Sequence, residues 1–323
     1  DYDRDTNPEL SKIEGVTSFC HVLTESNTTH KSVPMLLSPV SAQNFDSIYY
    51  RKSIITAFKE AGFQTAFFSN QRYNHSFIDF FGMEADTYDF IKEDSQDSQY
   101  NPSDDELLML VEKELEKGNR KQFIVLHTYG SHFNYRERYP ETAAFFLPDF
   151  PVDAEVKYKD NLMNSYDNSI RYTDNFLARI IHLLKQQQVD ASMLYTSDHG
   201  EDIFDDGRHL FLHASPVPSY YQLHVPLLLW TSDSYRKEYP RIEKAASMNR
   251  QKNISSSISF FQTMMELAGI ETPYRNDSLS VTSPLYTEKS RVYLNDHNDP
   301  RPLDDLGMKK QDFQMLEKRN IKY

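Results

Sequence analysis

The chain has 323 residues, of which 39% are hydrophobic, and 21 tyrosines and 21 phenylalanines provide material for a large core. Its formal net charge of −13 argues against a nucleic acid as partner, because phosphate backbones attract lysine and arginine. No apolar run approaches the ~20 residues that a membrane-spanning helix requires, and the single Cys20 excludes a disulfide within the chain. No linker-like tract or repeat is present, so we expect one large α/β domain or two small ones.

Predicted strands and helices alternate along most of the sequence. In chain order they are a strand at 16–23, a helix near Pro34, a helix at 53–61, a strand at 64–69, a helix at 103–117, a strand at 122–127, one long helix or two within 153–188, strands at 191–196 and 225–230, a helix at 254–268 and a strand at 291–295. Proline is tolerated in the first turn of a helix, so the helix near Pro34 should begin close before it or bend there. The alternation predicts a largely parallel sheet with helices on both faces.

Four groups of polar residues stand at predicted strand ends or in the loops that follow. They are Thr28-Thr29-His30, the segment 127–132, Asp198-His199 and the segment 209–213. An open α/β sheet places its chemistry beyond the carboxyl ends of its strands. An aspartate next to a neutral histidine offers one oxygen and one nitrogen ligand, a pair that suits zinc. Gly200, directly after this pair, lets the backbone turn so that both side chains can face one point.

These residues by themselves leave two interpretations open. Thr28 or Thr29 is either the N-cap of the following helix or a nucleophile, which needs an adjacent base or a metal to lower its pKa. Asp198 likewise either caps a helix start or binds a metal. A single His132 or His213 is more often a hydrogen-bonded residue than a ligand. The grouping at one edge of the sheet favours a metal site with a hydroxyl nucleophile, beside a helix N-terminus that can bind an oxyanion.

Several motifs occur together and in a fixed order. They are an opening segment at 2–8, T-x-x-S-V-P at 29–34, L-H and S-H at 126–127 and 131–132, N-x-Y-D-N…T-D at 164–174, S-D-H-G-E at 197–201 and L-H at 212–213. The combination of T-x-x-S-V-P with S-D-H-G-E is specific, whereas either motif alone is weak. With these motifs the sequence resembles the catalytic domain of the phosphoethanolamine transferases, a group of the alkaline phosphatase and sulfatase superfamily that includes lipid A-modifying enzymes.

The resemblance implies a fold and a set of roles. The fold would be a three-layer sandwich, with a central, largely parallel sheet between helices, in one catalytic domain that spans residues 1–323. Thr29 would be the nucleophile, and zinc would be held by Asp198, His199, Thr29 and a glutamate. His132 and His213 would surround the phosphoryl group or a second metal.

The resemblance also implies a substrate and a location. The donor would be a phospholipid, the acceptor lipid A or another glycan of the cell envelope, and the intermediate a phosphothreonine. His127, Ser32 and Lys31 would contact the substrate. The domain would be a monomer in the periplasm of a Gram-negative bacterium, attached to the inner membrane by N-terminal helices that these residues do not include.

The sequence departs from the family pattern at several positions. Glu25 and Met35 stand where family members often have cysteines, so packing must hold the nucleophile loop. Phe133 replaces part of the pattern that follows His132. His209 is an additional imidazole near His213, and we favour His213 as the residue that faces the site.

The metal-binding glutamate of the family belongs to a segment before Tyr2, on the first strand of the sheet. Without that strand, we expect a groove or an exposed strand edge beside Asp198, weak zinc binding and no activity of these residues alone.

Three other functions compete with this interpretation. A sulfatase or phosphodiesterase would hydrolyse its substrate, but the C-x-P-x-R or S-x-P-x-R motif of sulfatases does not occur at Thr29-His30-Lys31-Ser32. A phosphoglycerol transferase is nearer, although Ser32-Val33-Pro34 is evidence against it. A metal-free binding module would give Asp198 and His199 a purely structural role.

Overall fold

The computed structural model describes residues 2–92, 101–118 and 121–323. The α-helices are α1 (Thr29–Leu36), α2 (Ile54–Glu60), α3 (Phe77–Gly82), α4 (Asp105–Glu116), α5 (Lys159–Gln186), α6 (Tyr220–Leu223), α7 (Asp233–Glu238), α8 (Pro240–Asn249), α9 (Ser256–Leu267) and α10 (Lys310–Lys318). The strands are β1 (Val16–Phe19), β2 (His21–Leu23), β3 (Gln64–Ser69), β4 (Thr87–Phe90), β5 (Gln122–His127), β6 (Ser192–Thr196), β7 (Asp202–Ile203), β8 (Phe211–Leu212), β9 (Leu227–Thr231), β10 (Asn253–Ser255), β11 (Val292–Leu294) and β12 (Pro300–Pro302).

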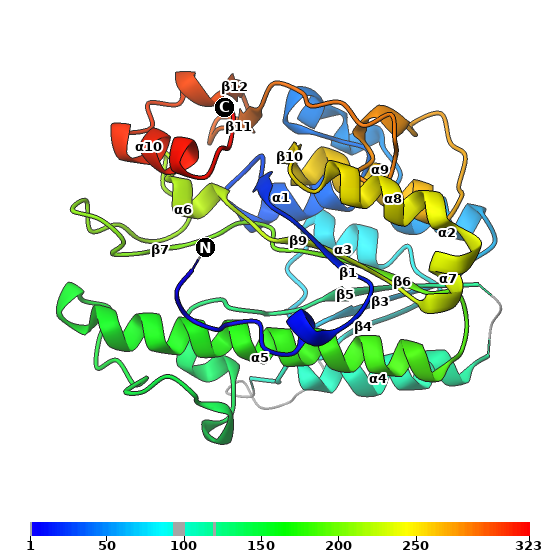
Figure 1. Ribbon diagram of the computed structural model, residues 1–323, viewed down its shortest axis with the longest axis horizontal. Coiled ribbons are helices and arrows are strands. Elements are labelled where there is room, and N and C mark those ends of the chain that lie inside the picture. The colour runs from blue at the N-terminus through cyan, green and yellow to red at the C-terminus, as the bar shows by residue number, and fades with distance from the viewer. Residues whose placement is uncertain (1, 93–100, 119–120) are drawn as a thin grey trace.

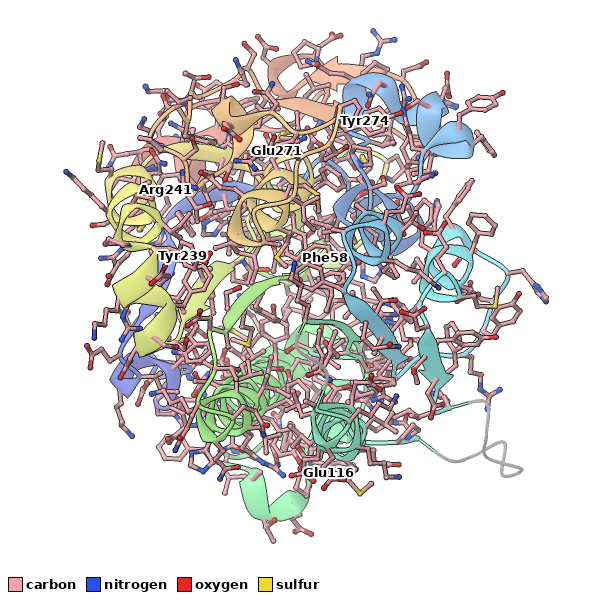
Figure 2. The ribbon with its side chains drawn as sticks, turned by 90° about the vertical axis from the view of Figure 1, so that its right-hand side faces the viewer. Phe58, Glu116, Tyr239, Arg241, Glu271 and Tyr274 are labelled. Carbon is pink, nitrogen blue, oxygen red and sulfur yellow. The ribbon has the colours of Figure 1, made fainter. Side chains whose placement is uncertain are left out.

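The strands lie between two layers of helices (Figure 1). Helices α4 and α5 cover one side, while α1, α8 and α9 lie on the other. The end view shows the same layers, with Glu116 of α4 on one side and Phe58 of α2 near the middle (Figure 2). Each layer buries apolar side chains against the strands, for example Phe81 of α3 against Phe67 of β3, and Phe176 of α5 near Phe68. The expected α/β sandwich is therefore confirmed.

The central strands form two separate hydrogen-bonded groups. Strands β4, β3 and β5 are parallel, as expected, whereas β9 runs antiparallel to both of its neighbours, β1 and β6. The reason is the path of the chain after β6. Residues 200–224 form the β7–β8 hairpin and α6 without a crossover helix of the usual length, so β9 runs back alongside β6.

Two local expectations need correction. The predicted strand at 16–23 is divided, because β1 pairs with β9 while β2 pairs with β10, and the Cys20 N–H between them donates to Arg250 O. Pro34 lies inside α1 instead of in its first turn, because the helix begins at Thr29.

The segment 153–188 contains one long helix, α5. Within the described residues, no helix combines the length and the apolar character needed to cross a bilayer.

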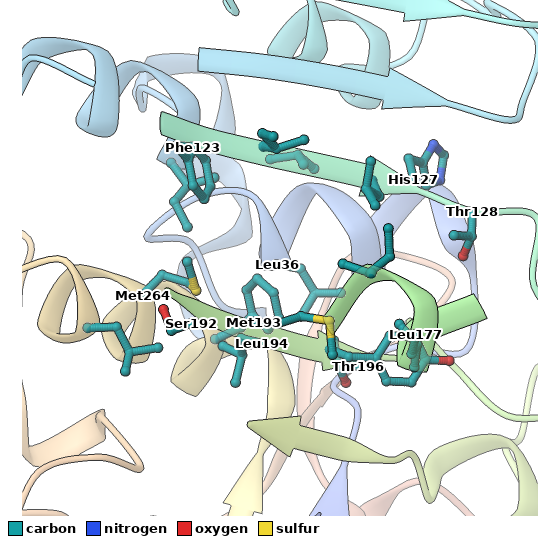
Figure 3. Close-up of a pocket in the computed structure, with 18 of the residues that line it drawn as sticks. Leu36, Phe123, His127, Thr128, Leu177, Ser192, Met193, Leu194, Thr196 and Met264 are labelled. Atoms are coloured by element: carbon teal, nitrogen blue, oxygen red, sulfur yellow. The ribbon is translucent and has the colours of Figure 1, made fainter. Parts of the chain in front are cut away.

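A large cavity separates the two groups of strands (Figure 3). It has a volume of about 1260 Å³ and is lined by β5 on one side and β6 on the other. The two strands run in the same direction, and no described strand pairs with either inner edge. All five residues of β6 are partly exposed, although the strand lies near the centre of the molecule. This slot confirms the expected groove beside Asp198, which also lines it.

Candidate active site

Three of the predicted site residues come together at one point. Thr29 Oγ1 lies 3.1 Å from His199 Nε2, and that nitrogen lies 3.4 Å from Asp198 Oδ2. Asp198 and His199 closely follow β6, and Thr29 is the first residue of α1. The Thr24 hydroxyl donates to Asp198 O at 2.7 Å, which fixes the backbone that carries the carboxylate. The strand end and the helix start therefore converge as the sequence predicts.

The structure distinguishes the nucleophile candidate from the helix cap. Thr28 is the N-cap residue, but its side chain makes no capping hydrogen bond and contacts the Ser26 hydroxyl at 3.2 Å. The Thr29 hydroxyl instead contacts the ring of His199. The first N–H groups of any helix lack partners within it, so the start of α1 can bind an oxyanion beside the Thr29 hydroxyl.

The arrangement fits part of a zinc coordination shell. Ligands about 2.0–2.2 Å from a tetrahedral zinc lie roughly 3.3–3.6 Å from one another. The separations of 3.1 and 3.4 Å around His199 Nε2 are close to this range. No described cluster contains three or more histidine, cysteine, aspartate or glutamate residues suited to a metal. Asp198, His199 and Thr29 therefore supply an incomplete ligand set.

A second histidine packs against the first. The ring centroids of His199 and His213 are 4.0 Å apart, and His213 Nδ1 lies 2.9 Å from Glu201 Oε1. The other Glu201 oxygen accepts a hydrogen bond from the hydroxyl of Tyr135, a fully buried residue. A carboxylate held in this way orients an imidazole and leaves its Nε2 available. The ring of His132, an exposed residue, lies 5.9 Å from that of His213.

The additional histidine lies elsewhere. His209 is exposed, and its backbone N–H donates to Asp206 O in the turn between β7 and β8. The structure thus brings His213, and not His209, against His199. Phe133, the departure after His132, packs edge to face against Phe211 and Tyr135.

The three predicted substrate-binding residues have different surroundings. His127 lies at the end of β5, lines the cavity and makes a 3.0 Å hydrogen bond with the Ser69 hydroxyl, and burial lowers its pKa. The Ser32 hydroxyl donates to Thr28 O at 2.8 Å and lies 3.5 Å from Asp198 Oδ2. Lys31 is buried, and its Nζ donates to Asn295 O at 2.6 Å. Lys31 therefore ties α1 to the β11–β12 hairpin.

A buried polar network holds the nucleophile loop. The Tyr293 hydroxyl donates to Asn27 Oδ1 at 2.6 Å, and Asn27 Nδ2 donates to Ser215 O at 2.9 Å and to the Gln222 side chain. Gln222 in turn donates to Asp202 Oδ2 at 2.6 Å. These bonds connect the loop to segments on either side of the site. They provide the anchoring that a local disulfide would otherwise give.

Glu25, at one of the positions where family members often have cysteines, is a buried carboxyl group. Its burial raises its pKa from an ordinary value of 4.5 to about 8. Between these values the unfolded chain loses the proton that the folded chain keeps, so folding becomes less favourable as pH rises, by up to about 1.4 kcal/mol per pH unit. We expect Glu25→Gln to remove this slope, whereas Glu141→Gln, at an exposed glutamate, should retain it. Denaturant unfolding of the variants between about pH 5 and pH 8 measures how the free energy of unfolding changes with pH. Equal slopes for the two variants would contradict the assignment of this pH dependence to the buried Glu25 carboxyl group.

Gly200 is required for a reason other than the expected turn. Its N–H donates to Gln222 O at 2.9 Å, and its backbone does not adopt a left-handed conformation. A Cβ at this position would lie 2.1 Å from Tyr221 O. The absence of a side chain lets the backbone after His199 lie directly against α6.

Sequence reasoning misses the supporting residues. Glu201 belongs to the S-D-H-G-E motif, yet the motif alone assigns it no role, and Asn27 stands two residues before the nucleophile candidate without a distinctive pattern. Tyr135 gives no signal, because its contact with Glu201 joins residues far apart in the chain.

Comparison with known proteins shows which family the chain belongs to. A model of the sulfatase family matches residues 1–270. Phosphoethanolamine transferase EptA of Salmonella typhimurium is 29% identical over an alignment of 301 residues, which covers 88% of this chain and 52% of EptA. Kdo(2)-lipid A phosphoethanolamine 7''-transferase of Escherichia coli is 26% identical over 288 residues, covering 84% of this chain and 49% of that protein.

A solved structure shows the same fold. The crystal structure of the C-terminal periplasmic domain of EptC from Escherichia coli, in complex with zinc, has a TM-score of 0.85 and 25% identity. The match covers 96% of this chain and 89% of that one. The chain spans about half the length of the curated relatives it matches. It belongs to the sulfatase family and is similar over most of its length to the phosphoethanolamine transferases.

Proposed function

We propose that the chain is the catalytic domain of a zinc-dependent phosphoethanolamine transferase. The observation that carries the proposal is the convergence of Thr29 Oγ1, His199 Nε2 and Asp198 Oδ2 at the start of α1. The names of the relatives support the same transfer, and one of them names lipid A as the acceptor. The donor is a phospholipid, and the acceptor is lipid A or another envelope glycan.

The reaction proceeds in two displacements. Thr29 Oγ1 forms a bond to the donor phosphorus while the bond from phosphorus to the glycerol oxygen breaks. His132 or His213 gives a proton to the leaving oxygen, which balances the proton that the Thr29 hydroxyl loses. An acceptor oxygen then forms a bond to phosphorus while the bond from phosphorus to Thr29 Oγ1 breaks, and the proton that the acceptor hydroxyl loses replaces the one that Thr29 lost. Zinc held by Asp198, His199 and Thr29 would lower the pKa of the hydroxyl and offset negative charge on the phosphoryl oxygens.

Glu201 and Tyr135 keep His213 in position for this chemistry. Glu201 accepts one hydrogen bond from the Tyr135 hydroxyl, and its other oxygen lies 2.9 Å from His213 Nδ1. The arrangement favours the tautomer whose Nε2 is free to exchange a proton or bind a metal.

A further strand completes the site in this proposal. The slot between β5 and β6 has two unpaired edges that run in the same direction, so a parallel strand can pair with both of these described strands. The end of such a strand would lie beside His127 and Asp198, where the fourth zinc ligand is needed. The resemblance implies that this ligand is a glutamate, carried by a part of the polypeptide outside residues 1–323.

Zinc titration tests the completed site. We expect residues 1–323 to bind zinc weakly. A form extended by some tens of preceding residues should bind zinc more than about a hundredfold more tightly. The reason is that mutation of a residue that only supports a ligand already lowers metal affinity about 10–100-fold. Isothermal calorimetry measures both affinities, and Asp198→Asn in the extended form should reduce the affinity again. Equal, tight binding by the shorter and longer forms would contradict the assignment of the fourth ligand.

The same relatives support a proposal about location. The solved EptC domain is named as periplasmic, and we propose that this domain also lies in the periplasm, attached to the inner membrane by a further part of the protein. We propose that it acts as a monomer.

Lipid analysis tests the function itself. Mass spectrometry of lipid extracts from cells with and without the gene should show a phosphoethanolamine added to an envelope lipid only when the gene is present. Release of free phosphoethanolamine without a modified acceptor would instead indicate a hydrolase, and no change in either product would leave a binding module as the better interpretation.

A further inference from the structure

One buried glutamine contacts three separate segments of the candidate active site. Gln222 belongs to α6 and is 0% exposed. Its side-chain oxygen accepts a hydrogen bond from Asn27 Nδ2, and its side-chain nitrogen lies 3.3 Å from Leu212 O. Its backbone oxygen accepts a hydrogen bond of 2.9 Å from the Gly200 N–H. The backbone and the amide of one residue therefore meet three separate parts of the chain.

Each of these partners is a close neighbour of a residue in the candidate site. The partner of the side-chain oxygen precedes Thr29 by two residues, that of the side-chain nitrogen directly precedes His213, and that of the backbone oxygen directly follows His199. The structure brings these three side chains together, with 3.1 Å from Thr29 Oγ1 to His199 Nε2 and 4.0 Å between the rings of His199 and His213. A displacement of the glutamine therefore acts on the placement of all three.

Groups that only accept hydrogen bonds fix the orientation of the Gln222 amide. Its Nε2 donates to Asp202 Oδ2 at 2.6 Å and also lies within hydrogen-bond distance of Leu212 O. A carboxylate and a backbone carbonyl have no proton to donate, so the amide nitrogen must point at them and the amide oxygen at Asn27. Ser215 O accepts from Asn27 Nδ2 at 2.9 Å and fixes the second amide in the same way. The two amides therefore have one arrangement that satisfies their partners.

The hydrogen bonds continue beyond the two amides at both ends. The Tyr293 hydroxyl donates to Asn27 Oδ1 at 2.6 Å, and Ser219 Oγ donates to Asp202 Oδ1 at 2.8 Å. All four of these residues are at most 2% exposed. A buried polar group that loses its partner costs about 1–3 kcal/mol, whereas an apolar core of the same shape can be equally stable. A closed set of directional bonds therefore does more than stabilise the fold, because it also fixes the distances between the segments that it joins.

We propose that Gln222 is a positioning residue for the nucleophile. It holds the nucleophile loop, the segment after β6 and the end of the β7–β8 hairpin at the separations that place Thr29 Oγ1 against His199 and the His213 ring beside it. Its hydrogen bonds go to the neighbours of these residues, so it acts through the backbone that carries them. The catalytic consequence rests on the proposed function, because it assumes that Thr29 attacks a phosphorus atom. The geometric role does not need that assumption.

Nuclear magnetic resonance of the Thr29 methyl group tests the geometric role. The sample is the chain of residues 1–323 labelled at its threonine methyl groups, and the Thr29 resonance is sensitive to the adjacent His199 ring. We expect Gln222→Met to move this resonance away from its wild-type position, because methionine has a similar length but forms none of the hydrogen bonds of the amide. The measurement requires neither zinc nor turnover.

The kinetics of transfer test the catalytic consequence. In the full-length enzyme, Gln222→Met should reduce kcat at least about tenfold, because a misplacement of about 1 Å can cost about a hundredfold in rate. The KM for phosphatidylethanolamine should change less than about threefold, since a fully buried residue does not reach the donor. A residue that only stabilised the fold would leave kcat per folded molecule unchanged.

A second buried glutamine provides the matched control. Gln262 of α9 is 5% exposed, its Nε2 donates to Tyr274 O at 3.0 Å, and its side-chain oxygen accepts from the Asn276 N–H at 2.7 Å. These partners lie in a loop that carries none of the candidate site residues. Gln262→Met should therefore also lower stability, but it should leave the Thr29 resonance and kcat unchanged.

Tyr293→Phe is a milder variant of the same network. It removes only the hydroxyl that donates to Asn27 and keeps the ring, so the protein should fold and the Thr29 resonance should still move. An unchanged Thr29 resonance in Tyr293→Phe or in Gln222→Met would overturn the proposal, and so would an equal change of the resonance or of kcat in Gln262→Met. If the resonance moved as expected while the lipid analysis showed no transfer, the proposed function would fail and the geometric role would stand.

Discussion

Thr29→Ala should reduce phosphoethanolamine transfer by the full-length enzyme by more than about a thousandfold, while the domain still folds. Loss of a nucleophilic hydroxyl removes the covalent pathway, and effects of this size or larger are found for nucleophiles in hydrolases. The Thr29 hydroxyl makes its contact with His199 Nε2 at the rim of the slot and contributes little to the core. A transfer assay with phosphatidylethanolamine as donor measures the loss.

The neighbouring threonine provides the control for this prediction. Thr28→Ala removes a hydroxyl that contacts Ser26 and makes no capping bond, so transfer should fall only a fewfold. If Thr29→Ala transferred at the wild-type rate, Thr29 would be no more than a residue of the first helical turn. A large loss in Thr28→Ala with an intact Thr29 would show instead that the conformation of the loop limits the reaction.

Gly200→Ala should destabilise the fold by about 3 kcal/mol or more. The added Cβ would lie 2.1 Å from Tyr221 O, and both groups belong to backbone that cannot move independently. The displacement would also move the adjacent His199 and Glu201, so zinc affinity should fall together with stability. Urea unfolding and zinc titration of the same samples measure the two effects.

Gly207→Ala is the matched control for the steric effect. Gly207 lies in the turn between β7 and β8, and a Cβ added there would have no heavy atom within 4 Å. Its backbone does not adopt a left-handed conformation, so alanine is not strained at this position. The substitution should change stability by less than about 1 kcal/mol. An equal effect at the two glycines would mean that chain flexibility, and not the contact with α6, makes Gly200 necessary.

Much of the fold could be predicted because several elements carry their own signal. The strands at 64–69 and 122–127 are predicted with their observed bounds, since short apolar runs between polar turns are distinctive. Helix α5 buries Phe176 and Ile180 on the face that the helical period predicts. The division of the strand at 16–23 could not be predicted, because it depends on which distant strands, β9 and β10, pair with its two halves.

Only some residues of the candidate site could be predicted from the sequence. Asp198, His199 and Thr29 are found from sequence because they belong to short motifs next to predictable strand ends and helix starts. The hydrogen bond from Tyr135 to Glu201 and the network around Asn27 involve partners far apart in the chain, so no local pattern reveals them. Two asparagines of α5 belong to the N-x-Y-D-N motif, yet only the structure shows that they bind the backbone of residues 146 and 148.

The most direct test of the central claim is a search for the covalent intermediate. Full-length protein incubated with phosphatidylethanolamine, without an acceptor, should give a peptide containing Thr29 whose mass is increased by one phosphoethanolamine group, and fragmentation should place the group on Thr29. Thr29→Ala should give no such peptide, and added acceptor should remove the group from the wild type. Transfer that proceeds at full rate with no modified peptide, or a group found on another residue, would contradict the assignment of Thr29 as nucleophile.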